Sequence, residues 1–165
     1  MRRIDEKNRL RVIRLVFSIS LIAFGTGFAN SQMARAQVAY PTKLWMAIIG
    51  EATADGPEGM LAVAVCVRNR LNAGLGVGLV AAHRKDLNRF VKREGRARAI
   101  LAKRIVQQVF EEGSVPDIIR GALYYDNFEK YGIPKWTKGK QIVILYRQGS
   151  HTFFNVKPRR RNAAQ

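Results

Sequence analysis

Hydrophobic positions divide the chain into an apolar N-terminal run, a helical middle and an end with the pattern of strands. Residues 15–29 contain no charged residue. Residues 40–52 have apolar positions nearly all round a helix, which predicts a buried helix with Pro41 in its first turn. Residues 55–71 predict a second helix, and the Gly-rich residues 72–86 predict a loop.

The second half changes from helical to strand periodicity. Residues 96–113 carry polar residues on one side of a helix and Leu101, Ile105 and Val109 on the other, which predicts an amphipathic helix. Residues 121–127 and 141–156 are rich in aromatic and β-branched residues, as strands are, and Gly149 offers a turn within the second stretch. Helices followed by a small antiparallel sheet predict one α+β domain over residues 37–156.

The N-terminal run has the flanks of a secretory signal peptide. Basic residues precede it, and the small residues Ala34 and Ala36 follow it, which predicts a signal peptide over 1–36 with cleavage before Gln37. The run is shorter than the roughly 20 apolar residues that a membrane span needs, although an uncleaved anchor stays open. We therefore expect an exported protein, located in the periplasm, in the cell wall or outside the cell.

Charge narrows the class of partner. The chain has 29 Lys and Arg against 12 Asp and Glu, a net +17; without residues 1–36 it keeps 22 basic and 10 acidic residues, a net +12. An exported protein this basic is expected to contact an anionic wall polymer or a membrane surface, and not nucleic acid. Residues 157–165 predict a basic disordered tail that adds a further anion contact.

Cysteine and histidine give no sign of a metal centre. Cys66 lies in the apolar stretch 61–67, which predicts a buried, unreactive thiol. His83 and His151 lack the spacing of zinc ligands. The sequence also lacks a G-x-S-x-G motif and a phosphate-binding Gly loop, so we expect no metal or cofactor.

Three carboxylates lie between the first two predicted helices. Glu51 shares a helix face with Leu44 and Ile48, which places its side chain at the edge of the core and disfavours its charged form, as a general acid requires. From the spacing alone, a solvated Glu at a helix end is the favoured interpretation. Asp55 and Glu58 have the spacing of a capping box at the start of the second helix, so we predict that Asp55 is a structural cap.

Motifs along most of residues 44–154 occur in the order found in one family. The segments are GEATADGPEGMLAVAVCVRNR (50–70), DIIRGALYYDN (117–127), Trp136 and GSHTFF (149–154). They resemble the cell wall hydrolase family typified by the catalytic domain of spore cortex-lytic enzymes, whose first block reads GEARGE-x-x-EG. The chain departs from the family pattern at Asp55, Ile119 and Phe154, where the family has Glu, Thr and Tyr.

The resemblance implies a small lysozyme-like domain that cleaves the β-1,4 bond between N-acetylmuramic acid and N-acetylglucosamine in peptidoglycan. It implies that Glu51 is the catalytic acid. Most glycosidases use two carboxylates, but no second catalytic carboxylate is obvious here beyond Asp55 and Glu58. The resemblance therefore favours a lytic transglycosylase, which needs only one Glu as acid and base. We expect a monomer that binds glycan strands. The resemblance implies that the substrate-binding residues are Glu58, Tyr124, Tyr125, Asn127, Trp136 and His151.

Two other functions stay open. One is an amidase that cuts between muramic acid and the stem peptide; such enzymes commonly use zinc, and the sequence lacks a credible ligand set. The other is a non-enzymatic wall-binding protein on the same scaffold, which the departures at Asp55 and Ile119 keep open.

Overall fold

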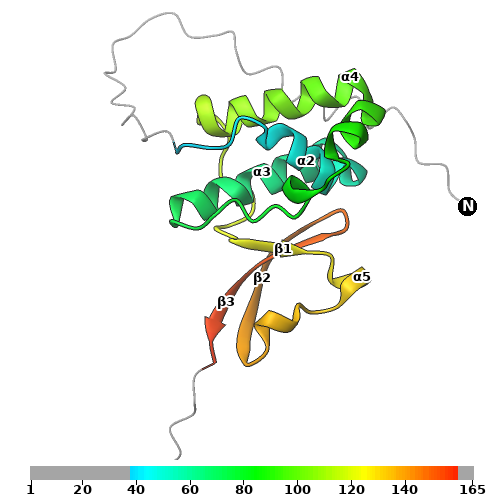
Figure 1. The fold of residues 1–165 in the computed structure, drawn as a ribbon. Coiled ribbons are helices and arrows are strands. Elements are labelled where there is room, and N and C mark those ends of the chain that lie inside the picture. The colour runs from blue at the N-terminus through cyan, green and yellow to red at the C-terminus, as the bar shows by residue number, and fades with distance from the viewer. Residues whose placement is uncertain (1–37, 160–165) are drawn as a thin grey trace, which may run out of the picture. The chain divides into compact units, whose positions relative to one another are not determined.

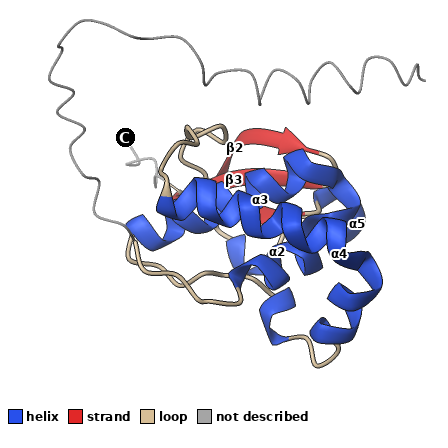
Figure 2. Cartoon of the chain, turned by 90° about the horizontal axis from the view of Figure 1, so that it is seen from above, coloured by secondary structure: helices blue, strands red, loops and turns tan. Residues whose placement is uncertain are grey.

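Helices from the first half of the described chain pack beside a small antiparallel sheet from the second half (Figures 1 and 2). The computed structural model describes residues 38–159; the predicted signal peptide over 1–36 and residues 160–165 of the tail lie outside the described residues. The helices are α2 (Leu44–Ala52), α3 (Gly56–Asn72), α4 (Leu87–Val106) and α5 (Phe128–Tyr131). The strands are β1 (Tyr124–Asp126), β2 (Lys140–Gln148) and β3 (His151–Pro158). The predicted α+β class is confirmed.

The first two predicted helices are confirmed, with one change at the start of α2. Pro41 lies before this helix, not in its first turn: the Leu44 backbone N–H donates to the Pro41 carbonyl over 2.9 Å, and α2 begins at Leu44. The Gly-rich stretch 72–86 is a loop that contains one 3-10 turn, Ala81–His83.

The third helix begins earlier than the sequence predicts. α4 spans Leu87–Val106 and continues as a π-helical turn over Gln107–Glu111. Gly95 interrupts α4 with φ 88° and ψ 170°, a backbone conformation that glycine adopts readily. The prediction covered only the part after this kink, because residues 87–94 carry few apolar positions and the helical period restarts at the glycine.

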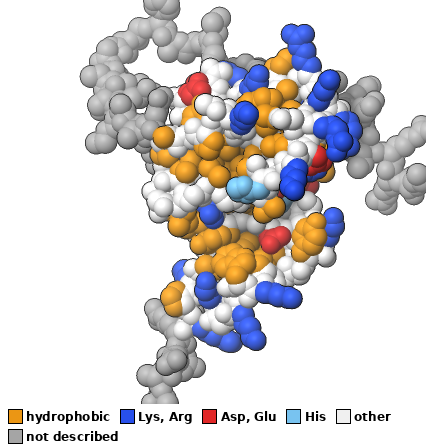
Figure 3. Space-filling view, in the orientation of Figure 1, with side chains coloured by type: hydrophobic (Ala, Val, Ile, Leu, Met, Phe, Trp, Pro, Cys, Tyr) orange, Lys and Arg blue, Asp and Glu red, His pale blue; other side chains and the backbone are white. Residues whose placement is uncertain are grey.

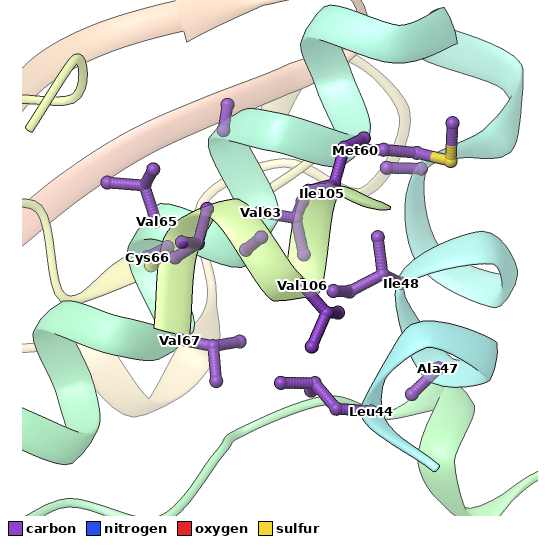
Figure 4. Packing of buried hydrophobic residues seen from close by; sticks show 14 of the residues in the cluster. Leu44, Ala47, Ile48, Met60, Val63, Val65, Cys66, Val67, Ile105 and Val106 are labelled. Atoms are coloured by element: carbon purple, nitrogen blue, oxygen red, sulfur yellow. The ribbon is translucent and has the colours of Figure 1, made fainter. Parts of the chain in front are cut away.

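The core lies where α2, α3 and α4 meet (Figure 4). Leu44 and Ile48 of α2, Val63 and Val67 of α3, and Ile105 of α4 are among its buried side chains. Cys66 is also fully buried, and burial raises the pKa of its thiol to about 12. The prediction of a buried thiol is confirmed. Among the described residues, no helix has the length and apolar character needed to cross a membrane.

β3 is the central strand of the sheet, with β1 and β2 antiparallel on its two sides. Because neighbouring side chains on a strand point to opposite faces, Phe153 packs into the helical core while Phe154 points away from it. We call this second side the outer face of the sheet. β3 extends to Pro158, so the predicted disordered tail is wrong for Lys157 and Pro158.

Candidate active site

Glu51 is the next-to-last residue of α2, and its side chain is partly buried. Its Oε1 accepts a 2.6 Å hydrogen bond from the backbone N–H of Ala81, the first residue of the 3-10 turn. Gly50 makes this approach possible, because a Cβ at position 50 would lie 2.7 Å from the Ala81 Cβ. The loop after α3 therefore folds back onto the end of α2 and fixes one oxygen of the Glu51 carboxylate.

Tyr125 reaches the same carboxylate from the sheet. It lies on β1 and packs against the helical core. Burial raises the pKa of its hydroxyl well above the ordinary value, and the charge of Glu51 raises it further. The hydroxyl therefore stays protonated beside Glu51 and can donate a hydrogen bond to it.

Asp55 lies at the residue before α3, as predicted, but it does not cap that helix. No hydrogen bond joins its side chain to the first N–H groups of α3. Its Oδ1 accepts from the Ser150 backbone N–H over 2.9 Å, its Oδ2 accepts from the Ser150 hydroxyl over 3.1 Å, and Oδ2 also pairs with His151 Nδ1. The capping-box prediction is wrong because the β2–β3 turn supplies these donors instead.

We call Asp55, Ser150 and His151 the Asp55 cluster. Its two ionisable members are largely enclosed, with 8% of the Asp55 side chain and 10% of the His151 side chain exposed, whereas Ser150 is exposed. Gly149 allows the close contact, because a Cβ there would lie 2.4 Å from Asp55 Oδ1. The cluster joins the start of α3 to the turn between β2 and β3.

The Asp55 cluster and Glu51 are connected through Tyr125. The rings of Tyr125 and His151 meet edge to face, with 5.1 Å between their centroids. One side of Tyr125 therefore faces the predicted acid and another faces the cluster. Of the residues predicted to bind substrate, the structure brings Tyr125 and His151 together, and Tyr125 lies beside Glu51.

The other predicted binding residues have different surroundings. Tyr124 and Trp136 lie 5.0 Å apart between ring centroids and pack with Phe154 on the outer face of the sheet, opposite to Tyr125. Asn127 Oδ1 accepts from the Lys130 backbone N–H over 2.9 Å and caps α5. The prediction that Tyr124 and Trp136 line one cleft with Tyr125 is therefore corrected, since adjacent strand residues face opposite ways.

Glu58 is exposed in the first turn of α3. Within residues 38–159, its carboxylate forms no hydrogen bond or ion pair. The second half of the predicted capping box is therefore wrong as well. Its role toward a substrate stays a prediction.

The end of the first motif anchors β1. Asn69 Nδ2 donates to Asp117 Oδ1 and to the Ala122 carbonyl, over 3.3 and 3.4 Å. Arg70 Nη1 donates to the Leu123 carbonyl over 2.9 Å. These bonds hold the chain just before Tyr125. Ile119, where the family has Thr, is fully buried, so it offers a substrate no hydrogen bond.

Two neighbours of Glu51 were missed by sequence reasoning. One is the Ala81 backbone N–H. It could not be predicted, because every residue type except proline carries a backbone N–H and the sequence does not show which one points at Glu51. The other is Arg84, which forms a 2.9 Å ion pair with Asp86. Its hydrogen bond to Asp86 is the main cause that raises the pKa of Arg84, and the charge of Glu51 adds to the effect. Both lie within residues 74–97, a stretch that none of the matched motifs covers.

Metal-ligating side chains do not gather at this site: within residues 38–159, no group of three or more His, Cys, Asp or Glu side chains could hold a metal ion. The site therefore consists of one partly buried carboxylate, a backbone donor, a buried tyrosine and the Asp55 cluster. No family model, curated protein or solved structure matches the chain.

Proposed function

We propose that the protein cleaves the N-acetylmuramic acid–β-1,4–N-acetylglucosamine bond of peptidoglycan as a lytic transglycosylase, with Glu51 as acid and base. The observation that supports this most is the setting of Glu51. It ends a buried helix, remains partly accessible, and is held by the Ala81 N–H beside the protonated Tyr125 hydroxyl. A catalytic Glu at the end of a buried helix, next to a small sheet, is also what a lysozyme-like fold would have.

In the proposed reaction, the protonated form of Glu51 gives its proton to the glycosidic oxygen. The bond from C1 of muramic acid to that oxygen breaks, and N-acetylglucosamine leaves with a free hydroxyl. The C6 hydroxyl of the same muramic acid then attacks C1 and returns its proton to Glu51. The products are a 1,6-anhydromuramic end and a regenerated acid, so one carboxylate is sufficient.

The occupation of Asp55 favours this route over a two-carboxylate mechanism. Both Asp55 oxygens accept hydrogen bonds from Ser150, and Oδ2 also pairs with His151. A carboxylate that is already bound on both oxygens is poorly placed to act as a nucleophile or to activate water. We assign Asp55 and His151 to the support of Tyr125, which in turn orients Glu51.

We further propose that the chain is exported and that its positive charge holds it at the anionic cell envelope. Peptidoglycan is the proposed substrate. No cofactor enters this mechanism, because the acid and the attacking hydroxyl come from Glu51 and the substrate.

The proposal is tested by the clearing of purified peptidoglycan with wild type, Glu51→Gln and Glu129→Gln. Gln keeps the shape of Glu51 but cannot give a proton, so clearing should fall at least about 100-fold. Glu129 is an exposed carboxylate on α5, and its variant should clear as wild type does. Unchanged clearing by Glu51→Gln would refute the proposal. Wild-type protein that pellets with peptidoglycan but never clears it would support a wall-binding protein.

A further inference from the structure

The outer face of the sheet carries exposed hydrophobic side chains beside lysines. Ile133 is 65% exposed, Trp136 48% and Ile144 47%. Ile144 pairs across the sheet with Phe154, and Trp136 packs on Phe154, so both lie on this face. Ile133 lines a shallow pocket together with Lys135, Lys138, Lys140 and Ile142, which puts the lysines at the same place.

We call the six exposed members the lysine patch: Ile133, Lys135, Trp136, Lys138, Lys140 and Ile144. The Lys140 ammonium lies 5.2 Å from the Trp136 ring centroid. Residues 130–144 contain four lysines and no Asp or Glu, and none of these lysines takes part in an ion pair within the described residues. In Figure 3, hydrophobic side chains lie among Lys and Arg over the lower part of the molecule, where the strands are.

We propose that the lysine patch binds the protein to an anionic phospholipid membrane surface. Tryptophan and isoleucine beside lysines suit the boundary between lipid headgroups and acyl chains. The apolar parts enter that boundary, and the flexible lysine stems keep their ammonium groups at the phosphates. Each lysine near an anionic surface strengthens binding by about fivefold. A membrane surface therefore satisfies both the apolar and the basic members of the patch.

A soluble anionic polymer fits the patch less well, because it would pair with the lysines but leave Ile133 and Ile144 in water. The basic face of α4 provides the contrast. Arg89 and Lys92 of α4 are exposed, as is Lys85 just before the helix, but no large hydrophobic side chain within residues 85–92 is exposed. The proposal rests on the outer face alone and does not depend on the chemistry at Glu51.

Trp136 can report on the contact directly. The chain has two tryptophans, and Trp45→Phe leaves Trp136 as the single tryptophan, which is excited selectively at about 295 nm in the full-length protein. This variant is titrated with vesicles of phosphatidylglycerol and phosphatidylcholine, and with phosphatidylcholine alone, each with or without brominated acyl chains. We expect a blue shift of Trp136 emission and quenching by brominated lipid on the anionic vesicles only.

Charge reversal then tests the lysines in the same background. Lys135→Glu, Lys138→Glu and Lys140→Glu together should weaken binding to anionic vesicles at least about tenfold. The matched control, Lys85→Glu, Arg89→Glu and Lys92→Glu, changes the net charge equally and should weaken it much less. Since both variants keep the same N-terminal run, a difference between their affinities for anionic vesicles measures the contribution of the lysine patch.

Two results would overturn the proposal. One is binding to anionic vesicles without any quenching of Trp136 by brominated lipid. The other is an equal loss of binding in the two charge-reversal variants, which would mean that net charge alone drives the contact. Neither result concerns peptidoglycan cleavage, so both are separate from the test of Glu51.

Discussion

At the scale of single residues, Asp55 shows that residue type and spacing can predict where a side chain lies along the chain but not which partners it binds. Asp-x-x-Glu before an apolar run is a good sequence sign of a helix cap, and Asp55 does precede α3. The side chain nevertheless binds Ser150 and His151, which are 95 and 96 residues away in the chain. A sequence pattern takes account only of nearby donors, whereas here the carboxylate binds donors that are distant in the chain.

The Asp55 cluster should therefore stabilise the fold. In Asp55→Ala, the largely enclosed His151 Nδ1 and the exposed Ser150 both lose their partner, which should cost about 1 to 3 kcal/mol of unfolding free energy. Urea denaturation measures this change. Asp86→Ala is the control, because its ion pair with Arg84 is exposed and should contribute far less to stability. Equal effects of the two substitutions would contradict a structural role for the cluster.

Tyr125 makes a prediction about alkaline pH. Its pKa is raised in the folded state by burial and by Glu51, while the unfolded chain ionises near the ordinary value of about 10. The stabilisation is thus fully present below about pH 10 and is lost as pH rises toward the folded pKa. The unfolding free energy of wild type should fall more steeply above pH 10 than that of Tyr125→Phe. Parallel curves for the two proteins would show that Tyr125 is not buried beside a charge.

At the scale of elements, most helices and strands could be predicted from periodicity. α2, α3 and the three strands follow directly from apolar spacing and β-branched content. The first half of α4 could not, because its face is mostly charged and Gly95 breaks the period. The contact between the Ala81–His83 turn and the end of α2 could not be predicted either. Gly50 leaves room for this contact, but the sequence does not show which distant segment packs against the glycine.

The close approach of Gly50 to Ala81 predicts that a single added methyl group at position 50 lowers both stability and activity. In Gly50→Ala the new Cβ would lie 2.7 Å from the Ala81 Cβ, so the turn must move and the hydrogen bond from Ala81 to Glu51 should weaken. We expect a loss of about 1 to 3 kcal/mol of stability together with reduced clearing of peptidoglycan. Gly76→Ala is the matched control, because a Cβ there meets no atom within 4 Å. Wild-type behaviour of Gly50→Ala would show that this approach is not required.

At the scale of the whole molecule, the net positive charge predicts that binding to an anionic surface depends on ionic strength. Sequence reasoning could give the class of partner from this charge, but not its position, because exposure decides which lysines lie beside apolar side chains. The same limit applied to the aromatic residues: sequence grouped Tyr124 with Tyr125, whereas the sheet separates them onto two faces.

Binding to isolated cell walls should therefore depend on salt. Raising the ionic strength from about 0.05 M to about 0.5 M shortens the distance over which charges act, so the bound fraction in a pelleting assay should fall severalfold. The same fall should occur for Glu51→Gln, because that change leaves the basic surface intact. Binding that does not respond to salt would contradict an electrostatic contact.

The central claim is that Glu51 alone supplies the acid and the base for non-hydrolytic cleavage of the glycan. Mass spectrometry of the muropeptides released from purified peptidoglycan tests it most directly. Wild type should release fragments with 1,6-anhydromuramic ends, and Glu51→Gln should release none above background. Reducing muramic ends from wild type would contradict the transglycosylase route, free stem peptides would indicate an amidase, and anhydro ends from Glu51→Gln would contradict the assignment of Glu51.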